Sequence, residues 1–142
     1  MIQHCPLCDS KGELVHERRA LKLGRRTAVV DQEFYRCGSC GEEWFTPEQM
    51  DAAQRRAAAQ VRQEEDLLEP DAIKAIRDDL QLSQAQFEKL LGFGPKTVGR
   101  WERGTVFQNR SSDLLMRLVR DFPDVVRYLA GRHGVELAVG QA

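Results

Sequence analysis

The chain has 142 residues, enough for one medium-sized domain or two small ones. Its 42% hydrophobic and 30% charged residues are typical of a soluble globular protein, and we find neither a signal peptide nor a long apolar run, so we expect a cytoplasmic protein without a membrane partner. The net charge of −1 does not suggest nucleic acid, but residues 83–120 carry seven basic side chains against three acidic ones. This local excess of positive charge favours nucleic acid as a partner.

Residues 1–46 contain all four cysteines, arranged as two Cys-x-x-Cys pairs: Cys5 with Cys8, and Cys37 with Cys40. Each pair directs two sulfur atoms at one point, so the two pairs can supply the four ligands of a tetrahedral zinc site. So short a segment buries too little apolar surface to fold alone, and bound Zn²⁺ would contribute roughly 10–16 kcal/mol. Two alternatives are disulfides, which rarely persist in the cytosol, and a redox pair, which normally lies near a βαβ pattern that is not visible here.

The same segment predicts a small zinc-ribbon-like sheet. Glu13–Glu17 and Thr27–Val30 have the apolar clustering of short strands, and Lys22–Arg26 between them are interpreted as a turn. Because all four predicted ligands are thiolates, no open position is left for water on the metal. We therefore expect a structural Zn²⁺ and no enzymatic activity.

Residues 47–69 predict a connector helix followed by a linker. Thr46 is placed to cap the helix, Pro47 suits its first position, and Gln49 can complete a capping box. The helix is rich in Ala, Gln, Arg and Glu, which favour helix but offer few large apolar side chains to bury. We expect it to be partly exposed and to end near residues 67–70.

Residues 70–131 predict an all-α domain of five short helices, and residues 132–142 form a tail without a clear period. The expected helix starts are Pro70, Ser83, Pro95, Ser111 or Ser112, and Pro123. Gln86 lies three residues after Ser83 and completes a second capping box. The chain as a whole is therefore predicted to be an α+β protein of two domains.

The helices that start at Ser83 and Pro95 have the arrangement of a helix-turn-helix. Val98 and Trp101 are expected to pack inward, while polar side chains at helical spacing face outward, where they could reach base edges in the major groove: Lys96, Thr97, Arg100 and Arg103. Gln84, at the start of the first helix, is placed to hold a phosphate. An ordinary helical pair with a solvated polar face has the same periodicity, so periodicity alone leaves both interpretations open.

The segment from Leu82 to Gly104 resembles the helix-turn-helix of the Xre/Cro family. It starts with Leu-Ser-Gln, has Leu-Gly at the turn and ends with Arg-Trp-Glu-Arg-Gly, all at the family's spacing. This resemblance implies DNA binding. Glu88 departs from the pattern, since the family usually has a small residue there facing the partner helix. This carboxylate must tilt outward or find a partner.

With two Cys-x-x-Cys pairs before that motif, residues 4–130 resemble the MqsA/YgiT-type antitoxins, which join an N-terminal zinc domain to a C-terminal Xre helix-turn-helix. The resemblance implies that the four cysteines hold zinc and that Lys96 and Arg100 read bases. Better-known members carry Asn at the position of Lys96. Since Asn suits adenine and Lys suits guanine, we expect a different operator.

The resemblance also implies a function. It implies that the chain is the antitoxin of a type II toxin–antitoxin pair and that it neutralises a small RNase-type protein toxin. It further implies a homodimer, formed through the C-terminal domain, that represses its own promoter by binding a palindromic operator in double-stranded DNA. An alternative hypothesis is a stand-alone repressor that responds to loss of zinc or to thiol oxidation. That alternative predicts a labile metal site, whereas the antitoxin hypothesis predicts a buried one.

Overall fold

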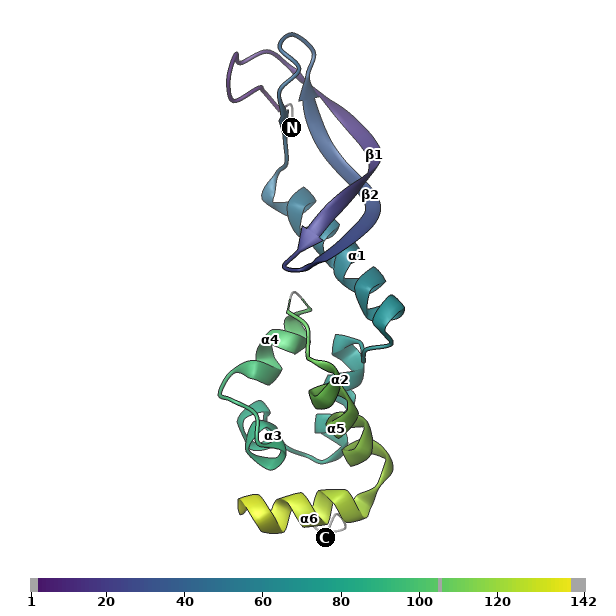
Figure 1. The fold of residues 1–142 in the computed structure, drawn as a ribbon. Coiled ribbons are helices and arrows are strands. Elements are labelled where there is room, and N and C mark those ends of the chain that lie inside the picture. Colours follow the sequence, from purple (N-terminus) through teal and green to yellow (C-terminus); the bar gives the residue numbers. More distant parts are fainter. Residues whose placement is uncertain (1–2, 105, 139–142) are drawn as a thin grey trace. The chain divides into compact units, whose positions relative to one another are not determined.

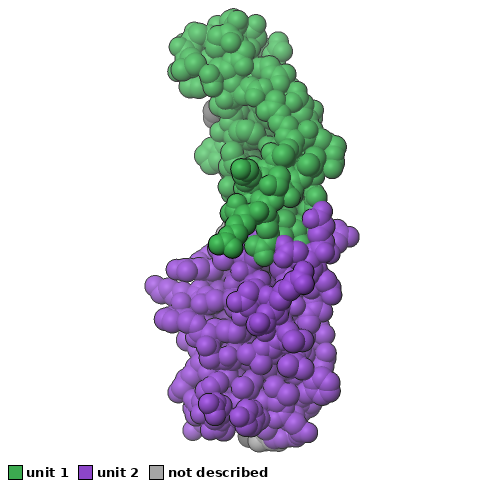
Figure 2. Space-filling model, in the orientation of Figure 1, with its two compact units in different colours: residues 1–61 green, residues 62–142 purple. Residues whose placement is uncertain are grey.

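The computed structural model describes residues 3–104 and 106–138. Within these residues an antiparallel sheet of three strands comes first and six helices follow (Figure 1), which confirms the predicted α+β architecture. The chain divides into two compact units, residues 1–61 and 62–142 (Figure 2). None of the described helices is long and apolar enough to cross a membrane.

The sheet is a long hairpin with a short third strand. β1 (Gly12–Leu23) pairs antiparallel with β2 (Arg26–Cys37) over its full length, and β3 (Glu43–Trp44) pairs with the end of β2. The expectation of short strands was wrong, because each of the two strands has 12 residues. The turn lies within the expected Lys22–Arg26 but is tighter, since only Gly24 and Arg25 connect β1 to β2. Gly24 has a φ of 63°, which glycine adopts without strain and which allows so tight a connection.

One face of the hairpin forms the interior of the first unit. Alternate residues of β2 turn to this face and are buried: Ala28, Val30, Gln32 and Phe34. Helix α1 (Pro47–Glu65) lies beside the hairpin (Figure 1), and the guanidinium of Arg56 donates a hydrogen bond of 3.1 Å to the backbone oxygen of Asp31. The first unit is therefore a hairpin backed by the greater part of a long helix.

Helix α1 begins with the predicted capping box. The Thr46 hydroxyl accepts a hydrogen bond of 3.1 Å from the backbone N–H of Gln49, whose side chain accepts one of 3.0 Å from the N–H of Thr46. The expectation that this helix buries little was only partly right, since Ala53 and Ala57 are fully buried. Short side chains on one face allow close packing without a large apolar surface.

Five helices follow α1: α2 (Pro70–Asp79), α3 (Gln84–Leu91), α4 (Thr97–Arg103), α5 (Arg110–Asp121) and α6 (Pro123–His133). Their starts at Pro70 and Pro123 agree with the sequence, and α3 has the predicted capping box of Ser83 and Gln86. The core between the helices is apolar, and its most deeply buried side chains are Ile73, Phe87, Leu90, Val98 and Met116.

Two predicted helix starts were wrong. α4 begins at Thr97 rather than at Pro95, because Lys96 takes a left-handed conformation with φ of 67°. α5 begins at Arg110 rather than at either serine, because the Asn109 side chain accepts a hydrogen bond of 2.8 Å from the N–H of Ser112 and caps the helix.

Helix α6, the last of the predicted helices, also extends further than expected. α6 runs to His133, past the predicted domain end at residue 131, and Gly134 terminates it with φ of 66°. Residues 139–142 of the predicted tail lie outside the described residues.

A buried polar network holds the linker before α2 to α5. The carboxylate of Asp113 accepts hydrogen bonds from the N–H of Leu68 (2.8 Å), the side-chain amide of Gln108 (3.0 Å) and Nε of Arg117 (2.7 Å). Gln108 also donates to the carbonyl oxygen of Leu68 at 3.0 Å. Burial alone raises the pKa of Asp113, but these donors outweigh it and lower the pKa below the ordinary value.

Candidate functional site

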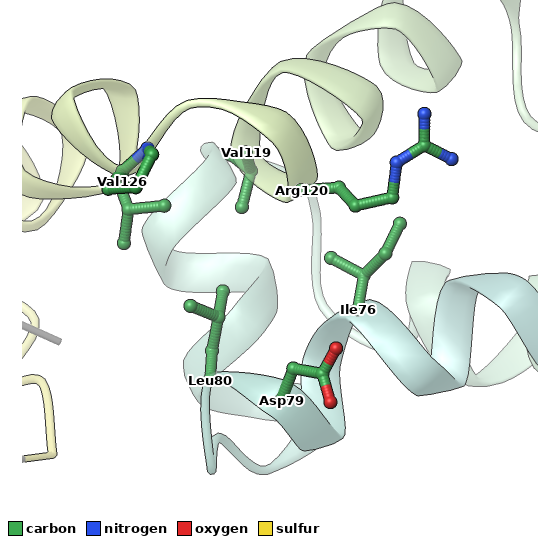
Figure 3. A pocket seen from close by; sticks show the side chains of 7 residues that line it. Ile76, Asp79, Leu80, Val119, Arg120 and Val126 are labelled. Carbon is green, nitrogen blue, oxygen red and sulfur yellow. The ribbon is translucent and has the colours of Figure 1, made fainter. Parts of the chain in front are cut away.

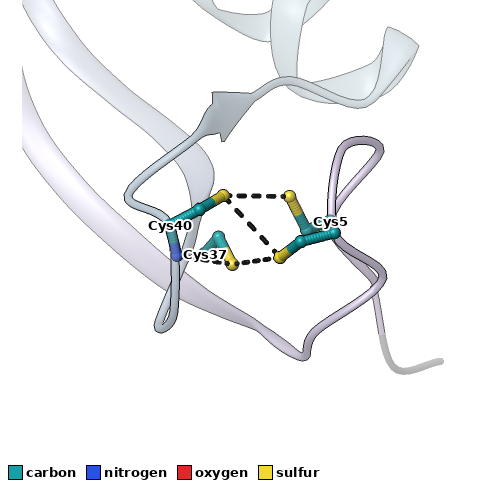
Figure 4. A group of neighbouring side chains, drawn as sticks. Cys5, Cys37 and Cys40 are labelled. Carbon is teal, nitrogen blue, oxygen red and sulfur yellow. Dashed lines mark hydrogen bonds between the residues drawn. The ribbon is translucent and has the colours of Figure 1, made fainter.

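The four cysteine sulfurs converge at one end of the hairpin. Cys5 and Cys8 lie in the loop before β1, Cys37 ends β2, and Cys40 follows in the next turn (Figure 4). The Sγ atoms of Cys5 and Cys40 are 3.6 Å apart, those of Cys8 and Cys37 3.4 Å, and those of Cys8 and Cys40 3.7 Å. All four lie within 4.8 Å of one another. The two pairs thus meet as the sequence predicted.

The two Cys-x-x-Cys segments repeat one backbone pattern. In each, the carbonyl oxygen of the first cysteine accepts a hydrogen bond from the residue four positions later: from Asp9 to Cys5 at 2.9 Å, and from Gly41 to Cys37 at 3.2 Å. Asp9 and Gly41 both have a positive φ, 63° and 79°. Two loops from different parts of the chain therefore present their sulfurs in the same way.

Nearby donors favour the thiolate form of two cysteines. The backbone N–H groups of Cys40 and Ser39 donate to Sγ of Cys37 at 3.4 and 3.3 Å and lower the pKa of that thiol. Hydrogen bonds from the side chain and backbone of Ser10 lower the pKa of Cys8 to about 6.

The fourth thiol shows the opposite tendency. The backbone of Glu42 lowers the pKa of Cys40, but its contact with Cys5, its partial desolvation and the neighbouring sulfurs of Cys37 and Cys8 together raise the pKa to about 12. Four sulfur atoms this close cannot all carry negative charge unless a cation lies among them. The cluster therefore requires either protons or a metal ion.

The geometry fits a tetrahedral metal ion and does not fit disulfides. Disulfide sulfurs are about 2.05 Å apart, much closer than the pairs seen here. Four sulfurs at about 2.3 Å from a tetrahedral zinc ion would lie about 3.8 Å from one another. The observed separations approach that value, so the four sulfurs are placed where they could together hold one metal ion. Cys5 and Cys37 are buried, and Cys8 and Cys40 are exposed.

In the second unit, α3 and α4 form the predicted helix-turn-helix. Val98 and Trp101 of α4 are buried in the same core as Phe87 and Leu91 of α3. Phe93 in the turn packs edge-on against Trp101, with ring centroids 5.0 Å apart. The inward face of α4 is therefore as the sequence predicted.

The side chains predicted to contact DNA lie on two adjoining elements. Lys96 precedes α4, while Thr97, Arg100 and Arg103 belong to it; the three basic residues are exposed and Thr97 is half-buried. Gln84 is exposed at the first position of α3. The structure thus brings the four residues around α4 together and places Gln84 on the neighbouring helix.

Gln84 lies close to α4. Its Nε2 donates to a carboxylate oxygen of Glu102 at 3.2 Å, and its Oε1 lies 3.1 Å from the place that a Cβ would take at Gly99. Glu102 in turn accepts two hydrogen bonds from the Arg77 guanidinium, of 3.0 and 2.9 Å. This partly buried ion pair fixes α4 to α2 and α3.

With this geometry in place, comparisons with known proteins identify the family. Residues 3–129 match the family described as "Antitoxin component of bacterial toxin-antitoxin system, MqsA". The chain belongs to the MqsA antitoxin family. The antitoxin MqsA of Escherichia coli strain K12 is 25% identical over 126 residues, which cover 86% of this chain and 95% of the relative.

A second relative of this MqsA-family chain matches a smaller part. The antitoxin HigA-2 of Vibrio cholerae serotype O1 is 30% identical over 63 residues, which cover 44% of this chain and 61% of the relative. Both relatives are antitoxins, and the family match and the match to Escherichia coli MqsA each extend over both units.

Two residues of the MqsA-family chain gain importance only in the structure. Glu88 does not tilt outward: it is 6% exposed and accepts hydrogen bonds from the backbone N–H groups of Lys96 and Val98. Arg62, to which the sequence analysis assigned no role, is 4% exposed and donates to the carbonyl oxygen of Gly104. Its position in a charged, alanine-rich helix offered no local signal.

Proposed function

We propose that this MqsA-family antitoxin neutralises a small RNase-type protein toxin and represses its own promoter as a homodimer bound to a palindromic operator. The observation that carries the proposal is the family match across both units, joined to a four-sulfur cluster in one and an exposed basic helix in the other. In this proposal the metal is Zn²⁺, its role is structural, and the protein acts in the cytoplasm without catalysis.

DNA reading is assigned to the exposed side of α4. Lys96 and Arg100 can donate to guanine O6 and N7 in the major groove, while Thr97 and Arg103 lie beside them on the same short helix. Gln84 and the first N–H groups of α3 are assigned to a phosphate. The inward face of α4 is fixed by Val98 and Trp101, so its outward face keeps one orientation.

Dimerisation is assigned to the helical unit, which exposes large apolar side chains. Phe122 and Tyr128 are 54% and 64% exposed, at the start of α6 and along it. In the same unit a pocket of about 140 Å³ opens among α2, α5 and α6 (Figure 3), lined by Ile76, Asp79, Leu80, Val119, Arg120, Pro123 and Val126. We expect Phe122→Glu to convert the dimer to a monomer in sedimentation analysis, while Arg132→Glu, an exposed change on the same helix, does not.

Toxin binding is assigned to the first unit. The face of the hairpin opposite its buried interior carries two exposed apolar residues, Leu14 (50%) and Val29 (45%), and the stacked rings of Tyr35 and Trp44. An exposed apolar surface rimmed by charged residues is suited to a protein partner.

Co-purification tests the proposal. The chain would be expressed with its neighbouring reading frame, with a tag on the antitoxin alone. We expect a stoichiometric partner that is a small basic protein and is toxic when expressed by itself. A Leu14→Glu/Val29→Glu variant should lose this partner while keeping its metal. Absence of a partner, together with DNA binding that is switched by metal loss, would instead support the stand-alone metal- or redox-responsive repressor.

A further inference from the structure

Helix α4 is too short to hold its own position. It has seven residues, from Thr97 to Arg103, and a helix of this length gains too few internal hydrogen bonds to be stable alone. Lys96 occupies the N-cap position but makes no side-chain cap. The backbone N–H groups at the start of α4 and the carbonyl groups at its end therefore need partners from other elements.

A carboxylate from α3 supplies the partner at the start. Oε1 of Glu88 accepts a hydrogen bond of 3.2 Å from the N–H of Lys96, and Oε2 accepts one of 2.9 Å from the N–H of Val98. Glu88 is buried, so these bonds are shielded from water. Its negative charge also lies at the positive end of the helix dipole.

A guanidinium supplies the partner at the other end. Arg62, in the last turn of α1, donates a hydrogen bond of 2.6 Å to the carbonyl oxygen of Gly104, the residue that terminates α4 with φ of 88°. The guanidinium also lies over the ring of Phe107, 5.1 Å from its centroid. Arg62 is buried, and its positive charge lies at the negative end of the helix dipole.

We infer that Glu88 and Arg62 act as a pair of positioning residues, which hold the two ends of α4 and thereby set how accurately the protein reads its operator. This inference rests on the proposed DNA-binding function. Lys96 is the residue most affected, because a lysine at φ of 67° is strained and Glu88 binds its N–H directly. Loss of either residue should loosen the base-reading side chains without removing a charge from the surface that faces DNA.

Amide hydrogen exchange in the full-length, metal-loaded protein tests the pair without DNA. In Glu88→Ala we expect faster exchange at Lys96 and Val98, and in Arg62→Met faster exchange along the last turn of α4. Arg62→Lys, which keeps the charge and one donor, should have a smaller effect. Val126→Ala, a substitution in the apolar core on α6, is the control. It should lower the stability of the helical unit but leave amide exchange in α4 unchanged relative to the other helices.

Operator binding at fixed salt, at a temperature where every variant is fully folded, tests the consequence. We expect Glu88→Ala and Arg62→Met to lower the specific affinity by about 5- to 150-fold, the range for loss of one good base contact. Affinity for random DNA and the salt dependence should be unchanged, because both side chains are buried. A purely structural role would lower the unfolding temperature and leave the specific-to-random ratio unchanged, as in Val126→Ala.

The two possible failures can be told apart. If the wild-type protein does not distinguish any selected operator from random DNA, the proposed DNA-binding function fails, and the role of the pair in reading bases fails with it. If the wild type discriminates and both variants discriminate equally well, or if exchange at α4 is unchanged, the function stands and the positioning role is overturned.

Discussion

The two units of the chain are stabilised by different means. The helical unit contains a continuous apolar core, with Phe87, Leu90 and Met116 completely buried. Among its described residues, the hairpin unit buries one large aromatic side chain, Phe34, together with alanines, two valines and two cysteines. Strand pairing and small side chains cannot compensate for the conformational entropy of so long a hairpin.

Charged groups supply part of what the hairpin unit lacks. Glu43 accepts hydrogen bonds from Arg19 and Arg36, which lower its pKa to about 2, and Arg19 lies over the ring of Phe34 at 4.2 Å from its centroid. These ion pairs are partly exposed, so each contributes little. Metal binding by the four cysteines, as proposed, is therefore expected to decide whether this unit folds, whereas the helical unit is expected to fold through apolar burial.

Metal removal should produce the largest difference between the units. Because structural zinc contributes roughly 10–16 kcal/mol, we expect a strong chelator, or the Cys37→Ser substitution, to unfold the hairpin while the helices remain folded. Heteronuclear NMR would follow both units in one sample, and metal analysis would identify the ion. Ser39→Ala, within the same loop, is the matched control and should keep the sheet. Persistence of the sheet in the metal-free protein would contradict this account.

A smaller effect is expected when the buried network of the helical unit is broken. Asp113→Ala leaves the N–H of Leu68 without an acceptor and the amide of Gln108 with only the carbonyl oxygen of Leu68, and we expect a loss of about 3 kcal/mol in the free energy of unfolding. Asp113→Asn keeps one acceptor and should lose less. Denaturant unfolding measures both, and equal stability of the alanine variant and the wild type would show that the network contributes nothing.

The carboxylate of Asp113 should also make the stability of the helical unit depend on pH in the acid range. Because its pKa is lower in the folded chain than in the unfolded one, its contribution is fully present above the ordinary carboxyl pKa of about 4. The contribution is then lost as the pH falls through the lowered folded value. Asp113→Asn should remove this part of the acid sensitivity of the helical unit, which unfolding midpoints between neutral pH and pH 3 would reveal.

DNA binding should depend on one unit alone. Arg100→Ala is expected to reduce specific operator binding by roughly 1–3 kcal/mol and to relax the preference at one base position. Lys74→Ala removes an equal charge from the exposed surface of α2 and should preserve that preference. A salt-controlled binding series with substituted operators provides the measurement. An Arg100→Ala variant with wild-type base preference would remove this residue from the recognition surface.

The smallest effect is expected on the surface of the hairpin. Arg18 and Asp31 form a cross-strand pair at 3.3 Å with side chains 64% and 76% exposed. Since exposed ion pairs contribute little, Arg18→Ala should change the free energy of unfolding of the metal-loaded unit by less than about 0.5 kcal/mol. A loss above about 1 kcal/mol would mean that exposed ion pairs stabilise the hairpin unit more than expected.

Local signals in the sequence predicted much of this molecule. The spacing of Cys5 and Cys8 was enough to indicate a metal-binding loop, and the capping boxes at Thr46 and Ser83 appear in the structure as expected. The start of α4 was missed because it depends on Glu88, eight positions earlier on another helix. Pro95 is a good first residue for a helix, but that local preference was overridden by a tertiary contact.

The sequence by itself determined the family, the cysteine cluster, the order of strands and helices, and the inward face of α4. Each of these depends on residues within a few positions of one another or on a recurring motif. Only the tertiary structure decided the roles of Glu88, Arg62 and Asp113 and the length of the hairpin. Arg62 lies 42 positions from Gly104, and Leu68 lies 45 positions from Asp113. A buried charge is stabilised only by the partners that folding brings to it, and no local pattern records them.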